Sequence, residues 1–196
     1  MITPKKKVTM KCDDAFFVNT QISHEKIFTV GDFWRWAFSD LQDNTLRGEL
    51  AEFIVAKALG IKVHVRESWA NYDLETEDGI QIEVKAGGFL QAWDQNKLSS
   101  PVFSRLKARS WNPIDGYDKE KSYRAHVYIF CVQTAKTHEE YNPLDLSQWE
   151  FRVVSMKALE KLDFKSLSYS SLCKLCPEKV SFNELRETMY RIKIGV

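Results

Sequence analysis

Several hallmarks of specialised protein classes are scarce or missing in this sequence. Four cysteines in 196 residues are too few for a disulfide-stabilised scaffold, and no apolar run approaches the roughly 20 residues of a membrane span. The basic start, Met1 to Lys7, has no apolar segment after it, which argues against a signal peptide. With 28 Lys and Arg against 27 Asp and Glu, neither sign of charge dominates. We therefore expect a cytoplasmic protein with no membrane partner and no uniformly basic surface.

The sequence does contain enough apolar material for one core. Hydrophobic residues make up 44% of the chain and aromatic residues 13%, an ordinary balance for a folded protein of this length. Helical and strand-like periodicities alternate, which predicts an α/β fold with helices flanking a mixed central sheet. We predict one domain over residues 1–196, with a weakly defined lead-in over 1–28, a motif-bearing core over 46–98 and a C-terminal elaboration over 147–196.

Capping residues and hydrophobic periodicity set the expected elements. Helices are expected at residues 33–41, 46–59, 89–98, 156–162 and from 182 to about 192. Strands are expected at residues 61–66, 72–76, 80–86, 124–133 and 148–154. The strand at 124–133 is the most apolar and is expected at the centre of the sheet, and Gly87-Gly88 is expected to end the strand before it.

The strand at 80–86 carries the most informative polar residues. Apolar and polar side chains alternate along it, so Glu83 and Lys85 lie on one face and Ile82 and Val84 on the other. Alone, a carboxylate and an ammonium two residues apart are typical of an ion pair on a polar sheet face. The hairpin register changes this interpretation, because a three-residue loop ending in a left-handed Gly79 keeps the apolar residues on one face. That register predicts the pairs Thr76–Ile80, Leu74–Ile82, Asp73–Glu83 and Tyr72–Val84.

Two carboxylates that face each other across strands repel, and a divalent cation would neutralise them. Asp73 and Glu83 offer only oxygen ligands, with no His or Cys nearby in the sequence, which favours Mg²⁺ or Mn²⁺ over Zn²⁺. Lys85 on the same face could polarise a water molecule or neutralise charge on a phosphate. The alternative is that Lys85 only neutralises the two carboxylates.

The helix at 46–59 supplies a further carboxylate. Glu49 and Glu52 fall on one helical face, and the small residues Gly48 and Ala56 beside them allow close approach to a sheet. Two glutamates on a helix are more often a solvated face. The spacing from Gly48 favours Glu52 over Glu49 as the residue that reaches the site.

Taken in order, these residues resemble the PD-(D/E)xK nuclease superfamily, which has the restriction-endonuclease-like fold. The resemblance covers residues 46–98 and is carried by Gly48, Glu52, Asp73, Glu83, Lys85 and Gln91. One departure is Tyr72, which stands where the family name has proline. The resemblance implies a Mg²⁺-dependent phosphodiesterase.

The same resemblance implies a role for each matching residue. Asp73 and Glu83 would bind the metal, with Glu52 as the helix carboxylate, and Lys85 would activate the water. Gln91, on the predicted helix at 89–98, is similar to a glutamine frequent in the family. By analogy with the family, which often cuts two strands as a dimer, a homodimer is an expectation.

A basic stretch follows the predicted site and suits a phosphate backbone. Its cations are Lys97, Arg105, Lys107 and Arg109, with no acidic residue from 97 to 109. The alternative is a solvated basic loop. Trp93 and Trp111 flank the stretch and could stack on bases, although core packing is the more common fate of a tryptophan.

Together these features predict a Mg²⁺-dependent DNA endonuclease of restriction, defence or repair. No nucleotide cofactor is expected, since Gly87-Gly88 lacks the Lys-Ser/Thr sequel of a phosphate-binding loop. The lone Cys173-x-x-Cys176 has no second ligand pair for zinc. The alternatives are a catalytically silent nucleic-acid-binding or scaffold subunit of the same fold, and an α/β domain with a charged sheet face.

Overall fold

A computed structural model describes residues 10–19, 24–62, 65–67, 70–112, 114, 116–163 and 165–194. The chain divides into two compact units, residues 1–41 and 42–196. The single domain expected over residues 1–196 stays a prediction. Lys5 to Lys7 and the two residues 63–64 of an expected strand lie outside the described residues.

The first unit contains a β-hairpin followed by a helix. Strands β1 (Ala15–Asn19) and β2 (His24–Thr29) pair antiparallel and lead directly into α1 (Val30–Phe38). Thr29 and Asp32 form the expected capping box, with the Thr29 hydroxyl accepting from the Asp32 N–H and the Asp32 carboxylate accepting from the Thr29 N–H. The helix therefore starts at Val30 rather than Phe33.

The second unit is built on a four-stranded mixed sheet with the order β3-β4-β8-β9. These strands are Leu74–Glu75, Gln81–Gly88, Val127–Gln133 and Trp149–Ser155. Strand β4 runs parallel to β8, whereas the β3–β4 and β8–β9 pairs are antiparallel. Every residue of β8 is buried, so the most apolar predicted strand lies inside the sheet as expected.

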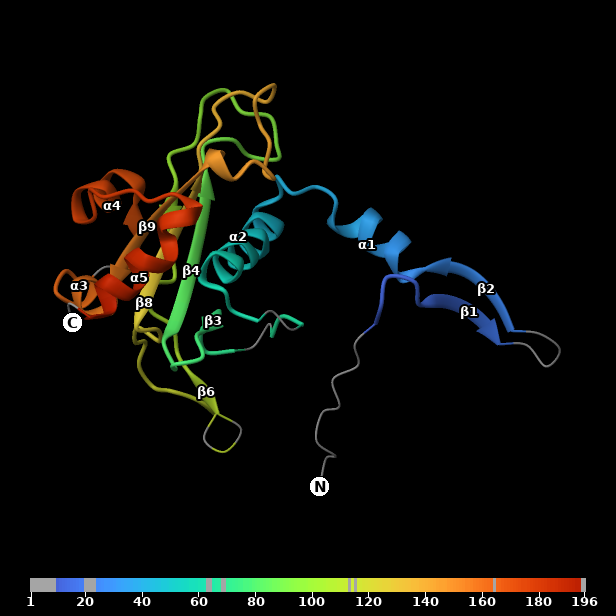
Figure 1. The fold of residues 1–196 in the computed structure, drawn as a ribbon, viewed down its shortest axis with the longest axis horizontal. Helices are drawn as coiled ribbons and strands as arrows, with labels where there is room; N and C mark the ends of the chain where they lie inside the picture. The colour runs from blue at the N-terminus through green and yellow to red at the C-terminus, as the bar shows by residue number, and fades with distance from the viewer. Residues whose placement is uncertain are drawn as a thin grey trace. The chain divides into compact units, whose positions relative to one another are not determined.

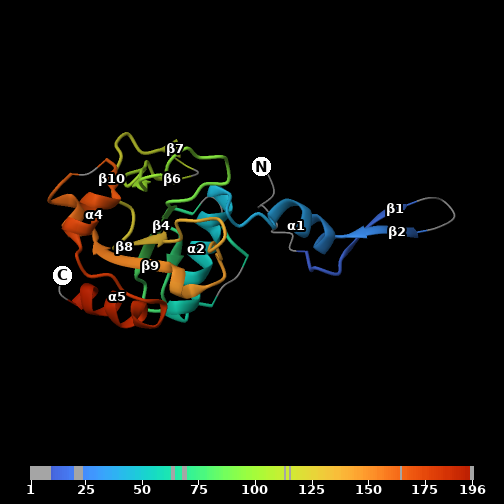
Figure 2. The ribbon, with the colours of Figure 1, turned by 90° about the horizontal axis from the view of Figure 1, so that it is seen from above.

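Helices cover both faces of this sheet, which confirms the α/β class with a mixed central sheet (Figures 1 and 2). On one face α2 (Asn44–Leu59) and α5 (Leu185–Ile194) pack against β4, β8 and β9, with the 3₁₀ turn η2 (Phe182–Glu184) before α5. Asp43 caps α2, and Gly60 ends it with φ +71°, as its sequence predicts.

The opposite face is covered by shorter elements packed on a second apolar cluster. These elements are α3 (Met156–Glu160), α4 (Tyr169–Leu175) and the paired strands β5 (Val102–Phe103) and β10 (Leu167–Ser168). A small hairpin, β6 (Trp111–Asn112) with β7 (Gly116–Tyr117), and the 3₁₀ turn η1 (Leu146–Gln148) complete the unit. Among the described residues no helix has the length and apolar character needed to cross a bilayer.

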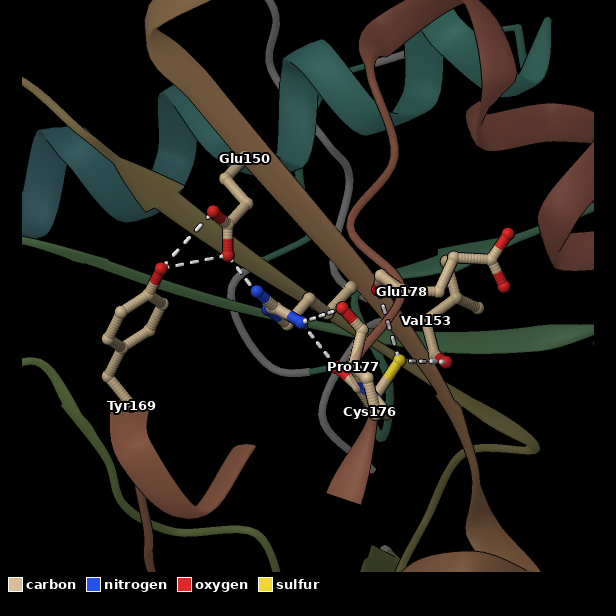
Figure 3. A network of polar contacts seen from close by, with 7 residues as sticks. Glu150, Val153, Tyr169, Cys176, Pro177 and Glu178 are labelled. Carbon is tan, nitrogen blue, oxygen red and sulfur yellow. Dashed lines mark hydrogen bonds and ion pairs between the residues drawn. The ribbon is translucent and has the colours of Figure 1, made fainter. Parts of the chain in front are cut away.

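A polar network fixes α4 to the edge strand β9 (Figure 3). The buried Arg152 donates from Nε to Glu150 at 2.7 Å and from Nη1 to the carbonyls of Cys176 and Pro177. The Tyr169 hydroxyl donates to both Glu150 oxygens at 3.0 and 3.1 Å. Burial, with the Glu150 carboxylate beside it, raises the pKa of Tyr169 to about 12. Arg152, Glu150 and Tyr169 bond to one another and to backbone carbonyls after α4, so the network is an anchor for α4.

Three predicted features of the core are wrong. The described residues of 61–66 are in no strand, no helix forms over 89–98, and β4 runs through Gly87 and Gly88 instead of ending before them. The glycines suit close packing: a Cβ on Gly87 would lie 3.1 Å from Pro101, and one on Gly88 would lie 3.1 Å from the Arg47 guanidinium, both tighter than ordinary contact. The pair therefore marks close approach of side chains to the strand.

Candidate functional site

The β3–β4 hairpin has the predicted register over its paired residues, but the pairing ends at Leu74, so the predicted Asp73–Glu83 pair does not form in the ladder. Leu74 pairs with Ile82 and Glu75 with Gln81. Gly79 has φ +78°, and its N–H donates to the Thr76 carbonyl at 2.9 Å, as the three-residue loop requires. Glu83 is therefore the residue of β4 just beyond the part that pairs with β3, and Asp73 is the residue just before β3.

Asp73 lies where β3 bends away from the sheet. Its N–H donates to the Ile82 carbonyl at 3.1 Å, and its Oδ2 accepts from the Val84 N–H at 2.7 Å. The carboxylate thus continues the ladder of hydrogen bonds along β4. Because of the bend, Tyr72 packs against the apolar cluster on the opposite face from Leu74, so the predicted Tyr72–Val84 pairing is wrong.

Glu83 and Lys85 project together from β4. Lys85 Nζ donates to Glu83 Oε1 at 2.6 Å, and the Lys85 and Glu83 side chains are only 19% and 9% exposed. Burial raises the pKa of Glu83, the Asp73 carboxylate raises it further, and Lys85 acts in the opposite direction. The repulsion expected between Asp73 and Glu83 therefore acts on Glu83 in the folded protein, and Lys85 opposes it.

Glu52 approaches Asp73 from α2, which packs on the sheet face opposite to the one that carries Glu83 and Lys85. Burial raises its pKa, and Asp73 contributes in the same direction, so Asp73 is the electrostatic neighbour of both Glu52 and Glu83. Both Glu52 oxygens are held by Arg66, whose Nε lies 2.5 Å from Oε2 and whose Nη2 lies 2.7 Å from Oε1. Glu49 lies 3.9 Å from Arg66 Nη1 and is more exposed. Of the two candidates on α2, Glu52 is the less exposed, with 13% of its side chain accessible against 41% for Glu49.

Asp73 and Glu83 provide few carboxylate oxygens that could serve as metal ligands. Among the described residues, no group of three His, Cys, Asp or Glu side chains is arranged to hold a metal ion. Mg²⁺ keeps several waters and needs only one or two carboxylates. In the part of the chain that the structure describes, Oδ1 of Asp73 and Oε2 of Glu83 have no hydrogen-bond partner. This pair of hard oxygen donors, in a locally anionic site, fits a hydrated Mg²⁺ or Mn²⁺.

Gln91 does not lie on a helix, contrary to expectation. It is 8% exposed, and its Nε2 donates to the Gly88 carbonyl at 3.1 Å, so its amide caps the end of β4. Its backbone accepts from Gln42 and donates to Gln95. These contacts give Gln91 a structural role in the loop after β4.

The basic stretch divides into three cations that remain accessible and one that is already paired. Lys97 and Arg105 are exposed, and Arg109 is likewise at the surface. Lys107 pairs with Asp163 and lies over the Tyr123 ring, with Nζ 4.9 Å from the ring centroid. Lys107 therefore helps to attach this segment to the fold and is the weakest of the four as a phosphate contact.

Two tryptophans expected in the core lie at the surface. Trp93 is 58% exposed and Trp111, on β6, is 54% exposed. Trp111 pairs across the small hairpin with Tyr117, which is also exposed. Both tryptophans are therefore available to stack on a base or a sugar.

Three arginines near the site escaped the sequence analysis. Arg66 holds Glu52, Arg124 lies close enough to Glu83 to lower its pKa, and Arg47 is buried beneath the end of β4. Arg66 alternates with apolar residues in the sequence, a pattern that predicted only a solvent-facing strand position.

No protein-family model and no curated protein sequence matches the chain. The case for a function therefore comes from these contacts and from the order of the motif residues.

The raised pKa of Glu83 gives a pH dependence that can be measured. Over the interval between the ordinary pKa of a glutamate and the higher folded-state value, the folded protein holds a proton that the unfolded chain has released. Stability therefore falls as pH rises through this interval. Glu83→Gln removes this loss, so in EDTA the variant should be more stable than wild type at pH 7 to 8, with the difference shrinking on acidification.

Chemical denaturation at a series of pH values, with the exposed turn variant Glu77→Gln as control, checks this result. A stability gain that is the same at every pH would mean that packing, and not the carboxylate charge, sets the difference.

Proposed function

We propose that the protein is a Mg²⁺-dependent DNA endonuclease with a restriction-endonuclease-like core. The observation that carries the proposal is the hairpin register, because it brings Asp73 beside Glu83 and Lys85 on a sheet edge that α2 approaches with Glu52. Carboxylates kept together despite repulsion, with a lysine hydrogen-bonded to one of them, are typical of phosphoryl-transfer chemistry and costly in a purely structural role.

Asp73 and Glu83 are the residues proposed to hold the metal, with Glu52 as a further ligand or a ligand to its waters. A bound divalent cation would supply charge neutralisation at the scissile phosphate and an acidified water. The protein contributes a fixed ligand position, because the Val84 N–H orients Asp73 at 2.7 Å. Burial and the Asp73 carboxylate destabilise the charged forms of Glu83 and Glu52, and a bound cation would relieve that cost.

Lys85 is proposed to act on the attacking water and on the phosphate. Its Nζ donates to Glu83 at 2.6 Å, which sets the direction of the ammonium group. A cation at this position stabilises negative charge that develops on the phosphate, and its remaining protons can orient a water for in-line attack.

Lys97, Arg105 and Arg109 are proposed as contacts to the DNA backbone, with Trp111 as a stacking surface beside them. Their position at the surface leaves them available to a phosphate backbone. The segment that carries them packs through Phe103 and Leu106 on the same sheet face as Glu83 and Lys85. A cytoplasmic location and a homodimer that cuts both strands complete the proposal.

The test is cleavage of supercoiled plasmid by wild type and by Asp73→Asn, with Mg²⁺ or EDTA. We expect nicked and linear products only with wild type and Mg²⁺, and at least a roughly 100-fold lower rate for the variant. Asp73→Asn keeps an oxygen that can accept from the Val84 N–H, so the fold is retained and a thermal melt confirms it. Equal cleavage by both proteins, or none under either condition on plasmid and on branched or single-stranded DNA, would overturn the proposal.

A further inference from the structure

The segment between α2 and β3 places one guanidinium among three carboxylates. Arg66 holds both oxygens of Glu52, at 2.5 and 2.7 Å, and approaches Glu49 at 3.9 Å. Asp73 also raises the pKa of Arg66, after the larger contribution of Glu52. A single cation therefore balances the acidic side of the proposed metal centre.

This contact occupies the atoms that a metal would need. A bidentate guanidinium lies in the plane of the carboxylate and takes one oxygen with each nitrogen. A divalent cation bound by Asp73 would lie near Glu52, because the Asp73 carboxylate acts directly on the pKa of Glu52. Such a cation would repel the guanidinium and compete with it for the Glu52 oxygens. Glu52 cannot serve both cations at once.

The exposure of Arg66 would allow its guanidinium to dissociate from Glu52. It belongs to no helix or strand, and its side chain is 43% exposed, whereas the Glu52 side chain is 13% exposed. Release would return the guanidinium to water at small cost, since ion pairs of this exposure contribute little free energy. Glu52, fixed on α2, would remain in the site.

We propose that Arg66 is an internal counterion that competes with the divalent metal for Glu52, so that metal binding requires displacement of Arg66. The proposal rests on the function above, since it assigns the metal to the same site. It makes Arg66 a positioning residue that acts through Glu52. In the absence of metal, Arg66 would then balance the neighbouring carboxylates of Glu49, Glu52 and Asp73.

The experiment measures Mn²⁺ binding by titration calorimetry and by the loss of the free Mn²⁺ signal in electron paramagnetic resonance. Wild type is compared with Arg66→Gln, Glu52→Gln and the double variant. We expect Arg66→Gln to bind Mn²⁺ about fivefold more tightly than wild type, in line with the modest strength of a half-exposed pair. This gain should be absent when the Glu52→Gln background is compared with the double variant.

Arg191→Gln is the matched control, because Arg191 forms a 2.6 Å pair with Glu178 on the exposed surface and lies outside the proposed site. It should bind Mn²⁺ as wild type does. Equal or weaker Mn²⁺ binding by Arg66→Gln would overturn the counterion role and leave the metal centre standing. No Mn²⁺ binding by any of the proteins would remove the metal centre itself, and the proposed function with it.

Discussion

Replacing Lys85 with methionine should lower the rate of DNA cleavage by at least roughly 100-fold while Mn²⁺ and DNA still bind. Methionine keeps most of the length of the side chain but removes the ammonium that donates to Glu83 at 2.6 Å. Loss of a positioned cation at a developing phosphate charge typically costs about two to four orders of magnitude in rate. The readout is single-turnover cleavage of plasmid, with DNA affinity measured separately in Ca²⁺.

The exposed Lys157 of α3 supplies the control, since Lys157→Met removes one positive charge outside the proposed site. It should cleave at the wild-type rate. If Lys85→Met loses DNA binding together with cleavage, Lys85 holds the substrate and does not act on the water. If Lys85→Met cleaves normally, the chemistry lies elsewhere in the protein.

Replacing Arg47 with methionine should destabilise the second unit by about 3 kcal/mol. Arg47 is 2% exposed, and it donates to the carbonyls of Gln42 and Leu90 at 2.8 Å each and to the side chain of Asn44 at 3.0 Å. Methionine fills similar space but removes all three hydrogen bonds. The buried Leu90 carbonyl that loses its donor costs about 1–3 kcal/mol, and the two part-buried bonds cost less. The lower desolvation cost of a neutral side chain offsets part of this loss.

Urea unfolding measures the effect, with the exposed Arg186→Met on α5 as a control expected within about 0.5 kcal/mol of wild type. A cycle with Gly88→Ala tests the mechanism. The new Cβ would lie 3.1–3.2 Å from the Arg47 guanidinium, so Gly88→Ala should be destabilising in wild type. The same change should cost less in the Arg47→Met background, where the guanidinium is gone. Additive losses in the double variant would show that Arg47 and Gly88 act separately.

The hairpin and the main helices could be predicted because their signals are local. The α2 boundaries follow from Asp43 and Gly60, which cap the helix through their own backbone geometry. The β3–β4 register follows from two-residue periodicity and one left-handed glycine. These elements place Asp73, Glu83, Lys85 and Glu52, so the candidate site rests on the part of the sequence that was easiest to interpret.

The errors have a common physical cause, which is that distant residues set the conformation. Gly87 and Gly88 suggested a break, but Phe103 and Arg47 need the space that a Cβ would fill. Gln91 suggested a helix, yet its amide is held at the end of β4 by the Gly88 carbonyl. Arg66 and Arg47 gave no sequence signal at all, because a buried or paired arginine is indistinguishable from a solvated one until its partners are known.

The bond from the Val84 N–H to Asp73 ties the geometry of the proposed site to the integrity of a very short strand. Strand β3 has two residues, and the carboxylate of Asp73 stands where a further backbone carbonyl would complete the ladder. The proposed ligand is therefore preorganised by the sheet itself, and it would lose little side-chain entropy on binding a cation. The short strand also makes the site prone to local unfolding. Fraying of β3 would release Asp73 while the buried strand β8 and the core around it stay folded.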